Sequence, residues 1–269
     1  MSSDETGPAT GIRRVSAVVG LTVVLLAAGM TGCASNPERD PGETYDPLEP
    51  MNRGIYAFND TLDRFLLRPV AKGYDTVVPR FMKFAVMNFF YNLEQPIYVA
   101  NHLLQGKFGG AARQTGRFAI NTVLGLGGII DAARDANLPR EPEDFGQTLA
   151  VWGVGGGPFL MLPVLGPSNF RDGVGKVADS FIDPLIQYDQ RSTRDKLIIL
   201  KIIDRRRQLL SADKAIREAA DPYIFIREAY LQNRRYNIYD GNPPEESLDD
   251  FEAEFEEFED FEDEDMDLD

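Results

Sequence analysis

Cysteine, histidine and tryptophan each occur only once in the 269 residues of this chain. One cysteine allows no internal disulfide, and one histidine without cysteine partners makes no zinc site. That histidine, His102, would also have to be the base of any hydrolytic triad, and no G-x-S-x-G elbow accompanies it. We therefore expect a protein that is not an enzyme and that holds no metal or cofactor.

Two glycine-rich stretches, "GLGG" and "GVGGGP", match nucleotide-binding loops poorly. No strand is predicted before either stretch, and neither is followed by Lys-Ser or Lys-Thr. Gly153, Gly155 and Gly157 instead permit positive φ angles and allow the chain to bend sharply. The sequence leaves open whether they form a mobile hairpin or a static turn.

Basic residues are absent from residues 245–269, where sixteen residues are Asp or Glu. Residues 33–244 hold 25 acidic and 26 basic residues, so this tail accounts for the excess in the net charge of −15. No basic stripe is present to neutralise phosphates, which excludes nucleic acid as a partner.

Aromatic residues recur in the acidic tail at spacings of three and four, at Phe251, Phe255, Phe258 and Phe261. Such spacing would give a helix one aromatic stripe, but like charges four residues apart oppose that helix. The tail is therefore predicted either to be disordered or to fold only against a basic partner surface.

The only long apolar run, residues 15–30, lies between Arg13-Arg14 and Gly32-Cys33. A basic segment, an apolar segment and a small-residue cleavage site are the parts of a secretory signal peptide. Cleavage before Cys33 would give the layout of a bacterial lipoprotein, whose first cysteine is acylated. We predict a signal peptide at 1–32 and an acylated tether at 33–45. A signal-anchor helix with an incidental cysteine is the alternative.

Helix signals dominate the following segment, and no useful stretch alternates with period two. We predict an all-α fold without a β-sheet, in which Pro69 and Pro184 each end a helix and Asp221-Pro222 opens the last one. The predicted helices span 51–67, 80–91, 96–105, 111–124, 129–136, 143–152, 169–183, 193–210 and a final segment from Asp221.

Apolar residues in these helices often occupy more than one face, and residues 159–165 form an apolar run where a polar connection is expected. No run in the helical segment reaches the roughly 20 residues that span a bilayer, but about ten helical residues match one leaflet. Two interpretations remain open: helices resting in a single leaflet, or the core helices of an ordinary globule.

Several long stretches carry a family resemblance, in the family's order, between about Asp46 and Gln232. They are "DPLEPMNRGIYAFND", "RPVAKGYDTVVP", "NLEQPIYVANHLLQG", "RFAINTVLGLGGIIDAA", "EDFGQTLAVWGVGGGPFLMLPVLGPSNFRDGVG" and "DPYIFIREAYLQ". With them the chain resembles the MlaA (VacJ) family of outer-membrane lipoproteins. The acidic tail lies outside the resemblance.

The resemblance implies a ring-like helical lipoprotein in the inner leaflet of the outer membrane, beside a trimeric porin. It also implies removal of stray phospholipid from the outer leaflet and transfer to a soluble periplasmic carrier, similar to MlaC, which serves an ABC-type complex. The family's flexible hairpin falls on Gly153, Gly155 and Gly157.

A lipid route needs a polar strip for the headgroup, and Arg171 and Asp172 are our candidates for it. A salt bridge or a helix cap is the alternative role for this pair. We expect the basic run Arg205–Arg207 to face water or headgroups rather than the route.

The sequence thus divides into a signal peptide (1–32), a tether (33–45), a helical domain (46–240) and an acidic tail (241–269). A scaffold or adhesion lipoprotein without a lipid route is the alternative function. A lipid hydrolase would need a nucleophile and base pair that the sequence does not offer.

Overall fold

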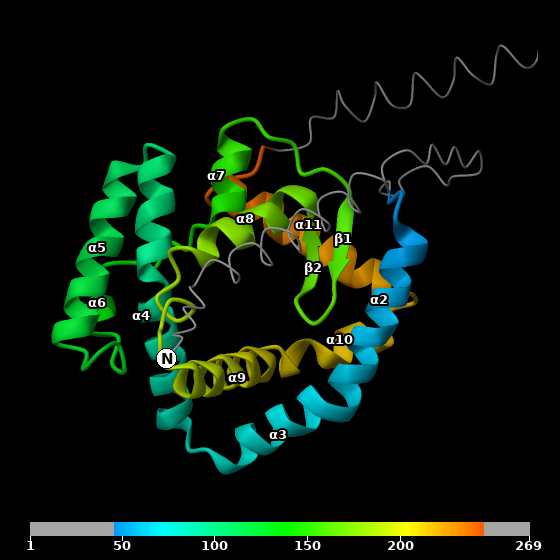
Figure 1. Cartoon of the computed structure of the whole chain (residues 1–269), viewed down its shortest axis with the longest axis horizontal. Coiled ribbons are helices and arrows are strands. Elements are labelled where there is room, and N and C mark those ends of the chain that lie inside the picture. The colour runs from blue at the N-terminus through cyan, green and yellow to red at the C-terminus, as the bar shows by residue number, and fades with distance from the viewer. Residues whose placement is uncertain (1–45, 245–269) are drawn as a thin grey trace, which may run out of the picture. The chain divides into compact units, whose positions relative to one another are not determined.

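A computed structural model of the chain describes residues 46–244 (Figure 1). The chain divides into two compact units between Pro47 and Leu48, and every described helix and strand belongs to the second unit. The predicted signal peptide, Cys33, the rest of the tether, and residues 245–269 of the tail lie outside the described residues.

Helices make up most of the second unit. In its first half they are α2 (Glu49–Leu62), the π-helix η2 (Asp63–Leu67), α3 (Arg68–Val77), α4 (Arg80–Leu104), α5 (Phe108–Val123), α6 (Ala132–Asp135) and α7 (Phe145–Val151). Two short strands, β1 (Phe159–Leu162) and β2 (Gly166–Asn169), then precede α8 (Phe170–Ser180), α9 (Arg191–Gln208), the 3₁₀-helix η3 (Leu210–Ala212), α10 (Asp213–Glu218) and α11 (Pro222–Ile238).

Contacts between these elements run in a closed circuit (Figure 1). The circuit passes from α2 through η2 to α3, α9, α4, α7, α8, β2 and β1, and returns to α2. Helix α5 packs on α4 outside this circuit, and α6 packs on α5. The predicted ring-like, predominantly helical fold is confirmed.

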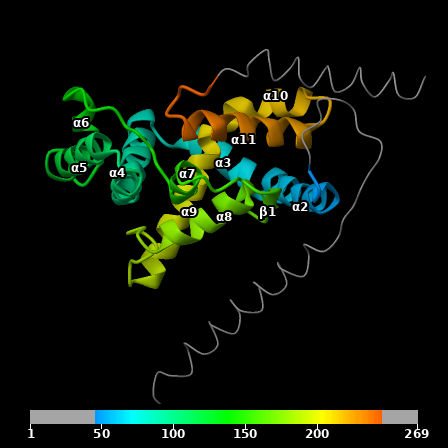
Figure 2. The same ribbon diagram turned by 90° about the horizontal axis from the view of Figure 1, so that it is seen from above.

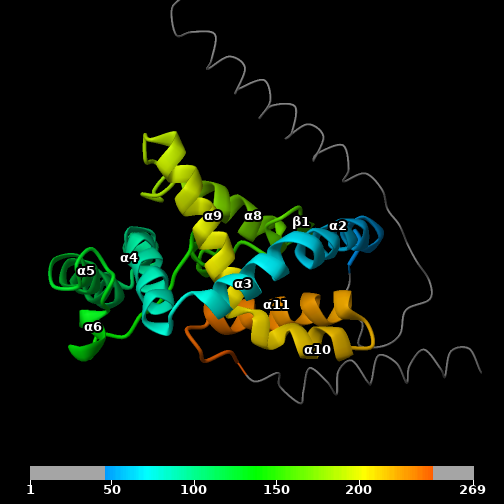
Figure 3. The same ribbon diagram turned by 90° about the horizontal axis from the view of Figure 1, so that it is seen from below.

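The ring of elements is not flat, and α10 and α11 lie to one side of it (Figure 2). Seen from above, α10 and α11 lie together on one side, and α8 and the start of α9 lie on the other (Figure 2). The view from below shows the same division (Figure 3). Helix α11 contacts α7, β2 and α10, so it ties the upper part of the circuit together from one side.

The prediction of no β-sheet is wrong for one hairpin. Strands β1 and β2 pair antiparallel from Phe159 opposite Asn169 to Leu162 opposite Gly166. Four residues are too few to display a period of two, so the sequence pattern indicates only a connection here. The strand nevertheless alternates, because Phe159 and Met161 are buried in a small apolar core with Tyr223.

Two proline positions were also predicted wrongly. The chain stays helical through Pro69, because η2 shifts its hydrogen bonds and Pro69 falls in the first turn of α3, where no N–H is needed. Helix α4 likewise continues through Pro96, whose neighbours Gln95 and Ile97 are both buried. Tertiary packing thus outweighs the local cost of this proline.

Candidate functional site

The glycine-rich segment 153–157 joins α7 to β1. Gly153 and Gly157 have φ angles of +86° and +67°, which other residues rarely adopt. A Cβ atom added to Gly155 between them would have no atom within 4 Å other than those of its chain neighbours. The predicted hairpin glycines therefore include two that the backbone requires and one that lies in open space.

Backbone hydrogen bonds hold one end of this segment against α8. The Arg171 N–H donates to the Gly156 carbonyl at 3.1 Å, and the Phe170 N–H donates to the Pro158 carbonyl at 3.3 Å. The Arg171 guanidinium donates to the Val154 carbonyl at 3.3 Å. The start of α8 therefore sets the position of the segment.

Arg171 and Asp172 are both buried, in a cluster of charged side chains. The Arg171 Nε donates to Asp172 Oδ1 at 3.0 Å, and Arg234 Nε of α11 lies 2.7 Å from Asp172 Oδ2. Tyr230 donates its hydroxyl proton to the same carboxylate. This placement matches the alternative role of an ion pair, and a role in a polar strip stays a prediction.

Asp144 extends the cluster to α7. Its carboxylate caps α7 by accepting from the Gln147 N–H at 2.9 Å, and Arg234 donates to both of its oxygens at 2.6 Å. Although burial opposes ionisation, the bonds from Arg234 and Gln147 hold the pKa of Asp144 below its usual value. The cluster therefore fixes α7, α8 and α11 to one another.

The sequence indicated Arg171 and Asp172 of this cluster but not the other members, Asp144, Tyr230 and Arg234. Asp144 and Gln147 do carry the spacing of a capping box, which could have marked Asp144 as a helix cap. Arg234 and Tyr230 lie far from Asp172 in the chain, and no local pattern points to them.

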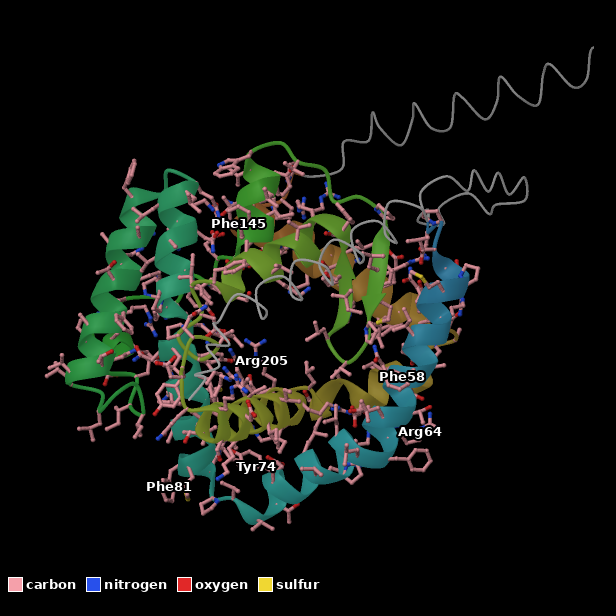
Figure 4. The ribbon with its side chains drawn as sticks, in the orientation of Figure 1. Phe58, Arg64, Tyr74, Phe81, Phe145 and Arg205 are labelled. Carbon is pink, nitrogen blue, oxygen red and sulfur yellow. The ribbon has the colours of Figure 1, made fainter. Side chains whose placement is uncertain are left out.

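A second charged cluster lies where α4 meets α9. Glu94 is only 8% exposed and binds two cations with Oε1: Lys201 Nζ at 2.9 Å, and the guanidinium of Arg205. Its Oε2 accepts the Tyr98 hydroxyl proton at 2.7 Å. Figure 4 shows Arg205 on the side of α9 that faces the middle of the circuit.

The basic run Arg205–Arg207 was expected to face water or headgroups, and this is wrong for two of its members. Arg206 donates to Asp63 and Asp213 with its side chain largely buried. Arg207 donates to Asp204 at 2.9 Å and is also largely buried. Arg205 keeps an exposed guanidinium, as expected, but it faces the middle of the circuit (Figure 4), where we had not expected it.

Large apolar side chains are exposed over much of the second unit. Phe81 at the start of α4 is 73% exposed, and Figure 4 shows it on the outer side of the circuit. Other exposed members include Phe65, Leu66, Val77, Phe84, Val123, Leu124, Leu126 and Phe181. None of the described helices is both long enough and apolar enough to cross a membrane.

His102 is buried at the end of α4, with its Nε2 3.2 Å from the Glu141 carbonyl oxygen. Within residues 46–244, no group of His, Asp and Glu side chains is arranged to hold a metal ion.

Comparison with known proteins agrees with this geometry. The family model described as "MlaA lipoprotein" matches residues 44–237, which is most of the chain. The chain belongs to the MlaA lipoprotein family. The match includes both charged clusters and the glycine-rich segment, and it ends before the acidic tail.

Relatives extend over nearly the whole matched region. The chain is 41% identical over 224 residues to the intermembrane phospholipid transport system lipoprotein MlaA of Escherichia coli K12, covering 80% of this chain and 88% of that protein. It is 35% identical over 238 residues to the protein of the same name from Haemophilus influenzae, covering 86% and 95%. An uncharacterised protein of Rickettsia bellii is 38% identical over 198 residues, covering 73% and 78%.

One solved structure is similar with a TM-score of 0.66 and 38% identity, covering 72% of this chain and 100% of that one. It is described by the words "Structural basis for maintenance of bacterial outer membrane lipid asymmetry". The similarity supports the predominantly helical, ring-like fold.

Proposed function

We propose that this protein removes phospholipid that has strayed into the outer leaflet of the outer membrane and passes it to a periplasmic carrier. Its family and its solved relative support a role in phospholipid transport and outer-membrane lipid asymmetry. The single observation that carries the finer proposal is the closed circuit of elements, which exposes many large apolar side chains and holds a charged cluster where α4 meets α9.

The energetics of a phospholipid explain why such a circuit suits the task. Burying each CH₂ of an acyl chain is worth about 0.8 kcal/mol, so release of two chains into water is prohibitive without an apolar path. A headgroup needs the opposite, a polar surface along the same path. A ring with apolar walls and a polar strip would accommodate both the acyl chains and the headgroup. A lipid in the wrong leaflet is already at higher free energy, so its removal needs no further energy source at this step.

The exposed apolar side chains support a position within one leaflet. Contiguous exposed apolar surface marks contact with a membrane or a partner, and the described helices are too short or too polar to span a bilayer. We place the second unit in the inner leaflet of the outer membrane, held there by the acyl chains on Cys33. Stable anchoring needs two such signals, which acylation together with the apolar helices supplies.

The proposed partners follow from the same route. A trimeric porin beside the ring would steady it in the leaflet, and a soluble carrier similar to MlaC would receive the lipid on the periplasmic side. Transfer of an intact lipid breaks no covalent bond, so no catalytic group is required. The segment around Gly155 is the proposed mobile hairpin of this route.

The proposal is tested by measuring phospholipid in the outer leaflet of cells that lack the gene. We expect surface-accessible phospholipid to rise several-fold on deletion, to return to normal with the wild-type gene, and to stay high with Cys33→Ser. Unchanged outer-leaflet phospholipid on deletion would favour a scaffold or adhesion protein. Release of lysophospholipid by the purified protein would favour a hydrolase.

A further inference from the structure

Two arginines of this protein are exposed to a similar extent and each pairs with a carboxylate, but they lie on opposite sides of the circuit. Arg205 is 60% exposed and pairs with Glu94, and Arg64 is 62% exposed and pairs with Asp60 at 2.7 Å. Figure 4 shows Arg205 towards the middle of the circuit and Arg64 on its outer side. One guanidinium group therefore faces the middle of the circuit, and the other faces its surroundings.

Glu94 fixes the position of Arg205. The carboxylate is buried on α4 and its two oxygens bind Lys201, Arg205 and Tyr98, so it has little freedom to move. Burial opposes its ionisation, but Arg205 and Lys201 hold the pKa of Glu94 below its usual value. The carboxylate therefore remains charged at neutral pH and keeps both cations in place.

The arrangement leaves hydrogen-bond donors of Arg205 unused. A guanidinium carries five N–H donors in a planar fork, and only the contact with Glu94 engages it among the described residues. Lys201 is one helical turn before Arg205 and faces the same carboxylate. Two cations thus share one carboxylate, while Lys201 also lies 3.8 Å from Asp183.

A planar fork with free donors matches a phosphate better than any other lipid group. Arginine binds phosphate oxygens in a bidentate manner, and such charge-assisted bonds are about twice as strong as neutral ones. An ester carbonyl or a glycerol hydroxyl offers no matching charge. A guanidinium with free donors therefore favours a phospholipid over an uncharged diacylglycerol.

We propose that Arg205, positioned by Glu94 and supported by Lys201, binds the phosphate diester of the phospholipid headgroup as the lipid passes through the circuit. This inference rests on the proposed function and names the group that recognises its substrate.

Binding to the purified, acylated full chain in detergent tests the proposal. The probes are dihexanoyl phosphatidylglycerol, dihexanoylglycerol without phosphate, and inorganic phosphate. We expect Arg205→Gln to weaken binding of the phosphatidylglycerol probe at least tenfold and to leave binding of dihexanoylglycerol unchanged. Arg64→Gln is the matched control and should alter neither. The proposal would be overturned if both variants lost binding of the phosphatidylglycerol probe equally, or if Arg205→Gln bound this probe as tightly as wild type does.

Two further arms separate the remaining explanations. Arg205→Lys keeps the charge but loses the fork, so it should fold and bind the phosphatidylglycerol probe only a few-fold more weakly than wild type. Binding of that variant as tight as that of wild type would show that charge alone, and not the planar fork, binds the lipid. Inorganic phosphate that binds as tightly as the lipid probe would contradict recognition of a headgroup.

The same variants in cells distinguish this inference from the proposed function. If deletion of the gene raises outer-leaflet phospholipid and Arg205→Gln fully reverses it, the function stands and the role of Arg205 is wrong. If deletion itself raises nothing, the proposed function fails first.

Discussion

Two asparagines on α2 take the place of a strand on the free edge of β1. The Asn52 side chain donates to the Phe159 carbonyl at 3.0 Å and accepts from the Met161 N–H at 2.9 Å. Two turns later, Asn59 repeats this pattern with the Leu162 carbonyl and the Val164 N–H, at 2.9 and 2.8 Å. The edge of a two-stranded hairpin is thereby satisfied and closed to further pairing.

Replacing Asn52 with alanine should therefore be costly. The change leaves two buried backbone groups without partners, and we expect a loss of about 2–4 kcal/mol in the free energy of unfolding. Denaturant titration in detergent measures this loss. Asn59→Ala is the matched control, and since Asn59 is only partly buried, water should replace its bonds at a cost of about 1 kcal/mol or less. Equal losses in the two variants would contradict this account.

The environment of Asp213, at the start of α10, leads to a prediction about how the stability of the protein depends on pH. Arg206 and Arg68 contact its carboxylate at 2.7 and 2.9 Å. Although burial opposes ionisation, these two arginines lower the pKa of Asp213 below its ordinary 3.8. A lowered pKa in the folded state stabilises the protein above the ordinary value, and the contribution is lost as the pH falls through the lowered value.

We therefore expect Asp213→Asn to be less stable than wild type at pH 7, and the difference to shrink as the pH falls below about 4. Urea unfolding across that pH range measures it. Glu218→Gln on the same helix, whose partner Lys214 is 3.9 Å away and exposed, should change little at any pH. A difference for Asp213→Asn that grows on acidification would contradict the assignment.

At the scale of elements, α7 and α8 cross at two glycines. A Cβ on Gly175 would lie 2.8 Å from the Cα of Gly146, and a Cβ on Gly146 would lie 2.6 Å from Asp172 Oδ1. Real Cβ atoms do not approach so closely, so the charged cluster of Asp144, Asp172 and Arg234 depends on both glycines. No larger residue fits at this crossing without separating the helices.

We predict that Gly175→Ala destabilises the protein by more than about 2 kcal/mol, as other changes that overfill a packed site do. Gly173→Ala on the same helix meets nothing within 4 Å and should stabilise by about 0.5–1 kcal/mol. Thermal unfolding of the two variants, side by side, measures the difference. Similar midpoints would show that α7 and α8 do not cross as described.

The elements also show what the sequence could predict. Asp221-Pro222 correctly marked the start of α11, where Asp221 accepts from two backbone N–H groups of the first turn, because capping is a local property. The hairpin β1–β2 was missed because its strands are stabilised by α2 and Tyr223, which lie far away in the chain. The local sequence pattern around residues 159–169 contains no information on such long-range contacts.

The candidate site divides in the same way. The need for glycine at positions 153 and 157 follows from the local sequence, and their positive φ angles agree with it. The pairing of Arg205 with Glu94 joins residues 111 positions apart, and that of Arg234 with Asp172 joins residues 62 apart. These partners are set by the packing of helices, so only the folded chain reveals them.

At the scale of the whole molecule, large exposed apolar surfaces mark contact with lipid or with a partner. Phe65 and Phe81 are 78% and 73% exposed, and burying each side chain in lipid is worth about 1.5–3 kcal/mol. We expect Phe65→Ser with Phe81→Ser, in the Cys33→Ser form, to lower binding to phospholipid vesicles at least tenfold. Vesicle flotation measures it, with the exposed Lys214→Ser as control. Undiminished binding would place these helices outside the membrane.

The central claim is that the protein provides a path by which phospholipid leaves the outer leaflet. Its most direct test is the rate at which headgroup-labelled phosphatidylethanolamine, introduced into the outer leaflet of living cells, is lost from the surface. The account predicts several-fold slower loss without the gene, and equally slow loss with Gly155→Pro at normal protein levels. Residue 155 has room for a methyl group, so cells with Gly155→Ala should lose the surface label at the wild-type rate. Equal rates with and without the gene would contradict the claim.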